Sequence, residues 1–261
     1  MWGVDARLVV SFMVAIAFDV LMPVAAVGWA RRRWDIRWKV MGVGALAFAL
    51  SQLLTRVPVV LLLQYLLREP LKQSPTLQNL WLAMLCLTAA LFEETARLLA
   101  FRHPLKDFRR WRDAVGFGLG HGGLESAAFV GGMAVLGLIN VVVLTRMDLS
   151  TLSLPAAQLE QVRAAKQAVA ALHWWEPLPG AYERLGALVF HVAMSVMVLQ
   201  RFVRGQRRWY WLAVGCHTVF NAAALVAVRL WGAVAAEGVV TVGALASLAF
   251  IVRQAEPDRA P

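Results

Sequence analysis

Charged residues are scarce in this sequence. They make up 16% of the 261 residues, whereas hydrophobic residues make up 60% and the mean hydropathy is +0.62. Soluble globular domains carry about 25% charged residues, so this composition excludes that class. We expect an all-α, polytopic bundle of membrane-spanning helices that forms a single integral membrane domain over residues 1–261.

Cysteines are also scarce, and internal repeats are missing. Cys86 and Cys216 both lie in apolar runs, which excludes a disulfide framework and a CxxC metal motif. Without a repeat, an inverted-repeat transporter gains no support. The formal net charge of +10 raises nucleic acid as a partner, but the basic residues are confined to short segments between apolar runs. We therefore expect a lipid bilayer as a partner and no nucleic acid.

Seven apolar runs have roughly the length of about 20 residues that a helix needs to cross a bilayer. The second contains Pro58, which favours a break into a helix and a half-helix, and Arg56, whose side chain we expect to reach the outer interface. The fourth is over-long and rich in glycine, which favours a tilt or kink. The predicted spans are 8–30, 40–66, 79–101, 114–143, 185–200, 209–228 and 231–252.

Lysine and arginine alternate between the connections of these runs. The basic segments are 31–39, 102–112, 201–208 and the C-terminal tail, and the other connections are poorer in these residues. Basic loops stay on the cytoplasmic side of a membrane. We therefore expect the N-terminus outside, the C-terminus inside, and a multi-pass location in the plasma membrane, of the bacterial inner-membrane type.

One outer connection is long, from about residue 145 to 184. Within it, apolar residues recur at roughly helical spacing over 155–175, a stretch that ends in Trp174 and Trp175. The pattern fits a helix that rests on the outer interface with tryptophan anchors. A solvated loop is the alternative.

Ionisable residues inside the predicted spans need an explanation, because each costs on the order of 3 kcal/mol or more in hydrocarbon. They lie on four spans: Glu93, Glu94 and Arg97, then His121 and Glu125, then His191, then His217 with Asn221. At a rise of about 1.5 Å per residue, the two glutamates of the third span and the three histidines lie about 12 to 15 Å from the cytoplasmic ends of their helices. We therefore expect one polar layer that four helices share.

Such a layer carries the ligands of a metal centre. Neutral imidazoles with a carboxylate suit Zn²⁺, which lowers the pKa of bound water to about 7. A second carboxylate can act as general base. Arg97 could hold one glutamate ionised, orient it, or bind a substrate carbonyl or carboxylate. A single intramembrane histidine is most often a packing residue, and a Glu–Arg pair is often only an ion pair, but their common depth favours a joint function.

The motifs resemble those of the YhfC family of intramembrane metalloproteases. The resemblance rests on Glu93-Glu94-x-x-Arg97, Gly-His121-Gly-Gly-Leu-Glu125, an isolated His191 and His217-x-x-x-Asn221. It covers spans three to six in detail and the seven-span layout more loosely. The sequence is similar more distantly to the PrsW proteases and to the CAAX- and bacteriocin-processing (CPBP) group, whose glutamate motif has the spacing EExxxR.

The resemblance implies a membrane endopeptidase in which glutamates and histidines bind a metal or activate water. Glu93 or Glu94 would be the base, and Asn221 would be a ligand or an oxyanion donor. The candidate ligands are His121, His191 and His217, to which we add Glu125 because it shares a helix face with His121.

These considerations predict a zinc-dependent intramembrane endopeptidase that hydrolyses a bond in a peptide or membrane-protein substrate near the cytoplasmic leaflet. Two other classes stay open: a non-catalytic scaffold or immunity-type membrane protein, and an ion- or proton-coupled transporter. A haem protein is less favoured, because acids at the same depth would be poorly placed beside haem.

Overall fold

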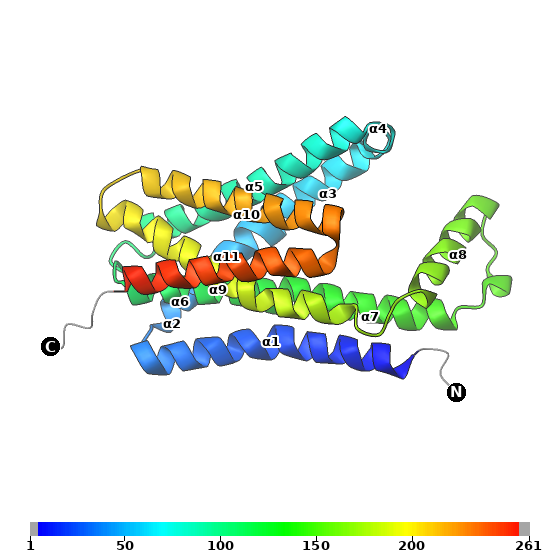
Figure 1. Ribbon diagram of the computed structural model, residues 1–261, viewed down its shortest axis with the longest axis horizontal. Helices are drawn as coiled ribbons and strands as arrows, with labels where there is room; N and C mark the ends of the chain where they lie inside the picture. The colour runs from blue at the N-terminus through cyan, green and yellow to red at the C-terminus, as the bar shows by residue number, and fades with distance from the viewer. Residues whose placement is uncertain (1–4, 256–261) are drawn as a thin grey trace.

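The computed structural model describes residues 5–255, and within that range every regular element is a helix. Seven helical spans are long and apolar enough to cross a membrane, which confirms the predicted all-α membrane bundle. Figure 1 shows most of them running along the long axis of the molecule. The spans are Ala6–Trp34, Trp38–Leu66, Pro75–Arg102, Trp111–Arg146, Pro177–Val203, Arg208–Trp231 and Ala233–Gln254.

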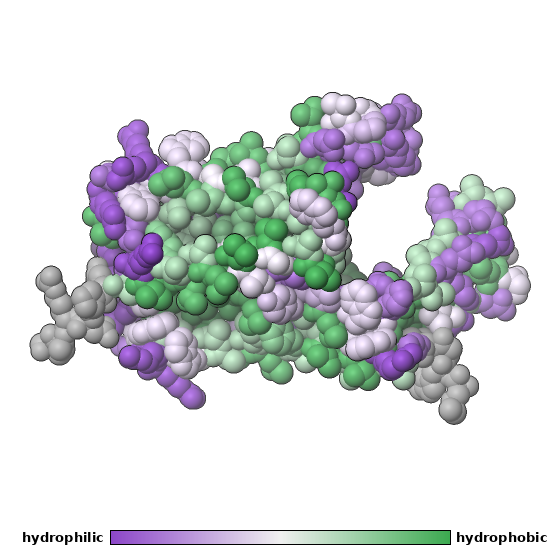
Figure 2. Space-filling model, in the orientation of Figure 1, coloured by the Kyte–Doolittle hydropathy of each residue, from purple (hydrophilic) through white to green (hydrophobic). Residues whose placement is uncertain are grey.

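The surface has the polarity of a protein that spans a bilayer. In Figure 2, hydrophobic residues cover the middle of the visible face, and hydrophilic residues gather at the end near the C-terminus and over α4 (Arg68–Gln73) and α8 (Ala156–Ala170). Many large apolar side chains along the spans are exposed, among them Leu54, Val219 and Trp231. Such a surface is stable against lipid tails rather than water. The chain is therefore a multi-pass membrane protein.

The second span stays continuous through Pro58. It consists of α2 (Trp38–Phe48), a π-helical segment η1 (Ala49–Arg56) and α3 (Val57–Leu66). The hydroxyl of Thr55 donates to the carbonyl of Leu50, five residues back. Pro58 lies two residues after the π-helical segment, and its missing N–H and its ring exclude the usual hydrogen bond to the carbonyl four residues back. The chain stays helical through this point, so the predicted break into a half-helix does not occur, and a π-helical segment takes its place.

The fourth span is also interrupted by a π-helical segment. It comprises α6 (Trp111–Leu124), η2 (Glu125–Val130) and α7 (Gly131–Arg146). Glycines let α6 approach α2 closely: a Cβ on Gly120 would lie 2.0 Å from the carbonyl oxygen of Met41, and one on Gly44 would lie 2.1 Å from that of Phe117. The glycine-rich stretch thus packs backbone against backbone.

Helix α9 (Pro177–Val203) occupies the centre of the bundle. It packs against α1 (Ala6–Trp34), α5 (Pro75–Arg102), α6, α10 (Arg208–Trp231) and α11 (Ala233–Gln254), and all residues from 190 to 200 are buried. It begins eight residues before the predicted span and so includes Arg184, which pairs with Glu125 and Glu183.

The connection between α7 and α9 contains a short 3₁₀ turn, η3 (Leu149–Thr151), and α8. The periodic stretch 155–175 is thus helical over Ala156–Ala170 rather than a simple loop. None of the residues of α8 is buried, and the helix projects away from the bundle in Figure 1. Its place on the outer membrane interface stays a prediction.

Candidate metal centre

Four side chains from three spans converge in the middle of the bundle. Glu93 comes from α5, His121 from α6, Glu125 from the start of η2 and His191 from α9, and one potential ligand atom of each lies within 4.8 Å of the others. Nε2 of His121 is 3.0 Å from Oε2 of Glu93. Nε2 of His191 is 2.5 Å from Oε2 of Glu125. We call these residues the four-residue cluster.

Arg97 connects the two glutamates of α5 to α9. Its side chain is fully buried and donates from Nη1 to Oε1 of Glu94 at 2.7 Å and from Nη2 to Oε2 of Glu93 at 3.5 Å. Nη2 also lies 2.7 Å from Nδ1 of His191, and Nε donates to Ser195 at 3.3 Å. An arginine can only donate, so Nδ1 of His191 accepts in this arrangement. A metal ligated by Nε2 of a neutral His191 would need that contact to give way, because the ring proton must then sit on Nδ1.

Glu94 belongs to a separate pair with His217 of α10. Its carboxylate is fully buried, and Oε1 accepts a hydrogen bond of 2.7 Å from Nδ1 of His217. An imidazole that donates from Nδ1 keeps Nε2 as an acceptor when it is neutral. The sequence could not assign different partners to the two adjacent glutamates. In the structure, Glu93 contacts His121 of the cluster and Glu94 contacts His217.

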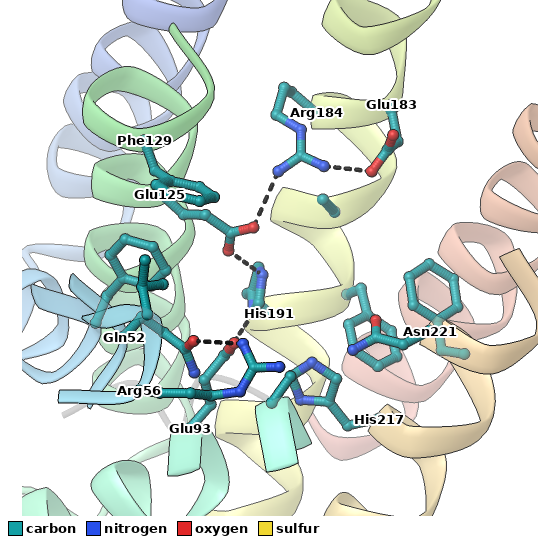
Figure 3. Close-up of a pocket in the computed structure, with 16 residues that line it drawn as sticks. Gln52, Arg56, Glu93, Glu125, Phe129, Glu183, Arg184, His191, His217 and Asn221 are labelled. Atoms are coloured by element: carbon teal, nitrogen blue, oxygen red, sulfur yellow. Dashed lines mark hydrogen bonds and ion pairs between the residues drawn. The ribbon is translucent and has the colours of Figure 1, made fainter. Parts of the chain in front are cut away.

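A cavity of about 220 Å³ lies against these groups (Figure 3). Glu93, Glu125, His191 and His217 contribute to its wall, and so does Asn221, one turn after His217 on α10. Neither Glu94 nor Arg97 lines the cavity. The eight predicted site residues therefore meet in one region, six of them at or behind the cluster and two, His217 and Asn221, on a neighbouring wall.

Four polar residues at the cavity, Gln52, Arg56, Glu183 and Arg184, were not among the predicted site residues. Arg184 of α9 donates from Nη1 to Oε1 of Glu125 at 3.0 Å and also pairs with Glu183. Gln52 and Arg56 come from η1. The prediction that Arg56 reaches the outer interface is wrong, because its side chain turns inward and bonds to residues of α5. The spacing of Gln52 and Arg56, i and i+4 in an apolar run, is the signal that could have identified them.

The four-residue cluster fits a metal ion. Imidazole nitrogen and carboxylate oxygen are ligands of zinc and of other divalent first-row metals. Two carboxylates balance the charge of a divalent cation. Arg97 and Arg184 each bond to a carboxylate of the cluster, as outer groups that orient ligands commonly do.

Comparisons with known proteins agree with this geometry. Residues 18–243 match the family model described as YhfC intramembrane metalloprotease, a range that includes the whole cluster. The chain is 29% identical over 244 residues to the "uncharacterized membrane protein YhfC" of Bacillus subtilis (strain 168), and the match covers 92% of each chain. No solved structure matches it. The family match extends over well more than half of the sequence, and the chain belongs to the YhfC intramembrane metalloprotease family.

Proposed function

We propose that this protein is a metal-dependent intramembrane endopeptidase, with Zn²⁺ held by Glu93, His121, Glu125 and His191. The observation that carries the proposal is the convergence of four ligand atoms within 4.8 Å beside a cavity inside a membrane bundle. A bound zinc ion would supply a Lewis acid that polarises a peptide carbonyl and makes water more acidic. Compared with the prediction from the sequence, Glu93 replaces His217 among the ligands.

His217 then serves as the general base. Its Nε2 is free to accept a proton, and it belongs to a side chain that lines the cavity. Glu94 accepts the Nδ1 hydrogen bond, which holds the ring in one tautomer and stabilises the imidazolium that forms. The same ring can return the proton to the leaving amine.

Asn221 is positioned to stabilise negative charge on the carbonyl oxygen. It lies one turn from His217 and lines the same cavity, so its amide faces the space that a substrate would fill (Figure 3). A preorganised amide donor aimed at a developing oxyanion contributes on the order of 3 kcal/mol in other hydrolases.

The reaction takes place at the depth of the inner leaflet. Glu93 lies nine residues from Arg102, about 14 Å along α5 from the arginine-rich end that we assign to the cytoplasm. The polar cavity would hold the water that hydrolysis consumes. At this depth the site can be reached by a peptide or by a protein of the plasma membrane, which is the substrate class that we propose.

The test combines metal analysis with proteolysis. We expect purified protein to contain about one zinc ion per chain and to cleave apolar peptides, and we expect His121→Ala to lose both properties. His173→Ala is the matched control, because His173 is exposed and outside the cluster. Wild-type protein that binds no divalent metal, or His121→Ala protein that cleaves at the wild-type rate, would contradict the proposal.

A further inference from the structure

One arginine at the cavity has no carboxylate partner. Arg56 is half-buried in η1, and its guanidinium bonds only to neutral acceptors. Nε donates to Oγ1 of Thr88 at 3.1 Å, Nη1 to Oε1 of Gln52 at 3.1 Å, and Nη2 to the carbonyl of Leu85 at 2.6 Å. No carboxylate among residues 5–255 lies within ion-pair distance of it. A cation without a counterion is expensive inside a membrane span, which points to a functional reason for it.

The other two arginines near the site are neutralised. Arg97 contacts Glu93 and Glu94, and Arg184 contacts Glu125 and Glu183. Both guanidinium groups therefore form ion pairs with carboxylates of the protein. Among these three arginines, Arg56 is the one whose charge is available to an anionic group that enters the cavity.

The unused donors of Arg56 are enough in number to bind a carboxylate. A guanidinium has five N–H donors, and three are used, which leaves one on each terminal nitrogen. One N–H on each terminal nitrogen is what a guanidinium uses to bind the two oxygens of a carboxylate. The contacts to Gln52, Leu85 and Thr88 hold this fork in place before a ligand arrives.

Both π-helical segments contribute to the wall of the same cavity. η1 contributes Gln52 and Arg56, and η2 contributes Glu125 and Phe129 (Figure 3). π-Helical segments occur often at functional sites. Arg56 thus shares the cavity with three members of the four-residue cluster, Glu93, Glu125 and His191.

The offset along α5 between the residues that hold Arg56 and the cluster residue Glu93 follows from the sequence. Thr88 and Leu85, which hold the guanidinium, precede Glu93 by five and eight residues. That separation corresponds to roughly 8 to 12 Å of helix. An extended peptide covers it with two to four residues, at about 3.3 Å each.

We propose that Arg56 is the anion-binding residue of the substrate cavity, and that the substrate carries a carboxylate two to four residues from the bond that is cut. The carboxylate comes from an acidic side chain or from the C-terminus of the peptide. The position relative to the cut rests on the proposed function, whereas anion binding at Arg56 does not.

The experiment measures the binding of one fluorescent apolar peptide in four forms. An internal position is Glu or Gln, and the C-terminus is a free carboxylate or an amide. We expect at least one form with a carboxylate to bind wild-type protein about tenfold more tightly than the form with none, the value of one charge-assisted contact. The form that shows the gain identifies the source of the carboxylate.

Three variants make the test specific. In Arg56→Met the preference should fall to within about twofold, and in Arg56→Lys, which keeps a point charge without the fork, to about threefold. Arg56→Lys also covers the case in which Arg56→Met does not fold. Arg68→Met, at an exposed arginine of α4, should keep the full preference. Equal binding of all four forms, no binding of any form, or a full preference in either Arg56 variant would overturn the proposal.

Metal content and cleavage are measured on the same samples. A carboxylate preference in protein without metal or proteolysis would overturn the proposed function and leave the Arg56 site standing. Bound metal and proteolysis without a carboxylate preference would overturn the Arg56 proposal and leave the proposed function standing.

Discussion

Oε1 of Glu94 lies 2.7 Å from Nδ1 of His217, across the contact between α5 and α10. The preceding residue, Glu93, instead points to His121 of α6. Adjacent residues on a helix differ by about 100° in direction. Two glutamates that are indistinguishable in the sequence therefore reach different partners and should have different roles.

Substitution of the two glutamates by glutamine separates these roles. Glu93→Gln removes a member of the cluster and should lower zinc affinity by at least about tenfold. Glu94→Gln should leave the zinc content within about twofold of wild type and reduce the cleavage rate by about 10²- to 10⁴-fold, since it impairs the base. Metal analysis and peptide cleavage on both variants check this, and the opposite pattern would exchange the two assignments.

Arg97→Met should destabilise the metal-free protein by about 3–5 kcal/mol, because it leaves buried carboxylates without their cation. Added zinc should restore part of the loss, since the metal supplies positive charge to the same carboxylates. Thermal unfolding with and without zinc measures both effects. Arg68→Met at an exposed ion pair is the control, with a change below about 0.5 kcal/mol.

Arg184→Met should weaken zinc binding by about 10- to 100-fold, because Glu125 loses the donor that orients it. Arg184→Lys should recover part of the affinity. Competition with a chelator gives the affinities. Arg163→Met on α8 removes an exposed ion pair and should leave zinc binding unchanged. An affinity in Arg184→Met equal to that of wild type would exclude a positioning role for Arg184.

Two glycines of α2 provide a matched test of the packing against α6. Gly44→Ala should destabilise the protein by about 1–3 kcal/mol, since its Cβ would meet the carbonyl oxygen of Phe117 at 2.1 Å. Gly42→Ala has open space around its Cβ and should be neutral or stabilising by up to about 1 kcal/mol. Unfolding of both variants in the same detergent measures the difference, and equal stabilities would show that α2 and α6 pack less closely.

The orientation in the membrane can be tested with single cysteines in a chain whose Cys86 and Cys216 are replaced by alanine. An impermeant maleimide should label Ser150→Cys in intact cells, because residue 150 lies in the connection that we place outside. Gln206→Cys, between α9 and α10, should react only after the membrane is disrupted. Both positions are exposed in the fold. The reverse labelling would invert the proposed topology.

The sequence by itself determined the helical class and the seven spans, and it predicted a common depth for the polar residues. Each of these is a one-dimensional property. Hydropathy over about 20 residues identifies a span, and a constant rise per residue converts a position in the chain into a depth. The convergence of Glu93, His121, Glu125 and His191 is consistent with their common depth.

Only the tertiary structure decided which groups at that depth touch. It separated Glu93 from Glu94, extended α9 to include Arg184, and turned Arg56 inward from a π-helical segment. These outcomes depend on how each helix rotates about its axis and on which opposite charges meet once the helices pack. Neither rotation nor pairing between distant segments is encoded in the local pattern of one span, because both are set by contacts with the neighbouring helices.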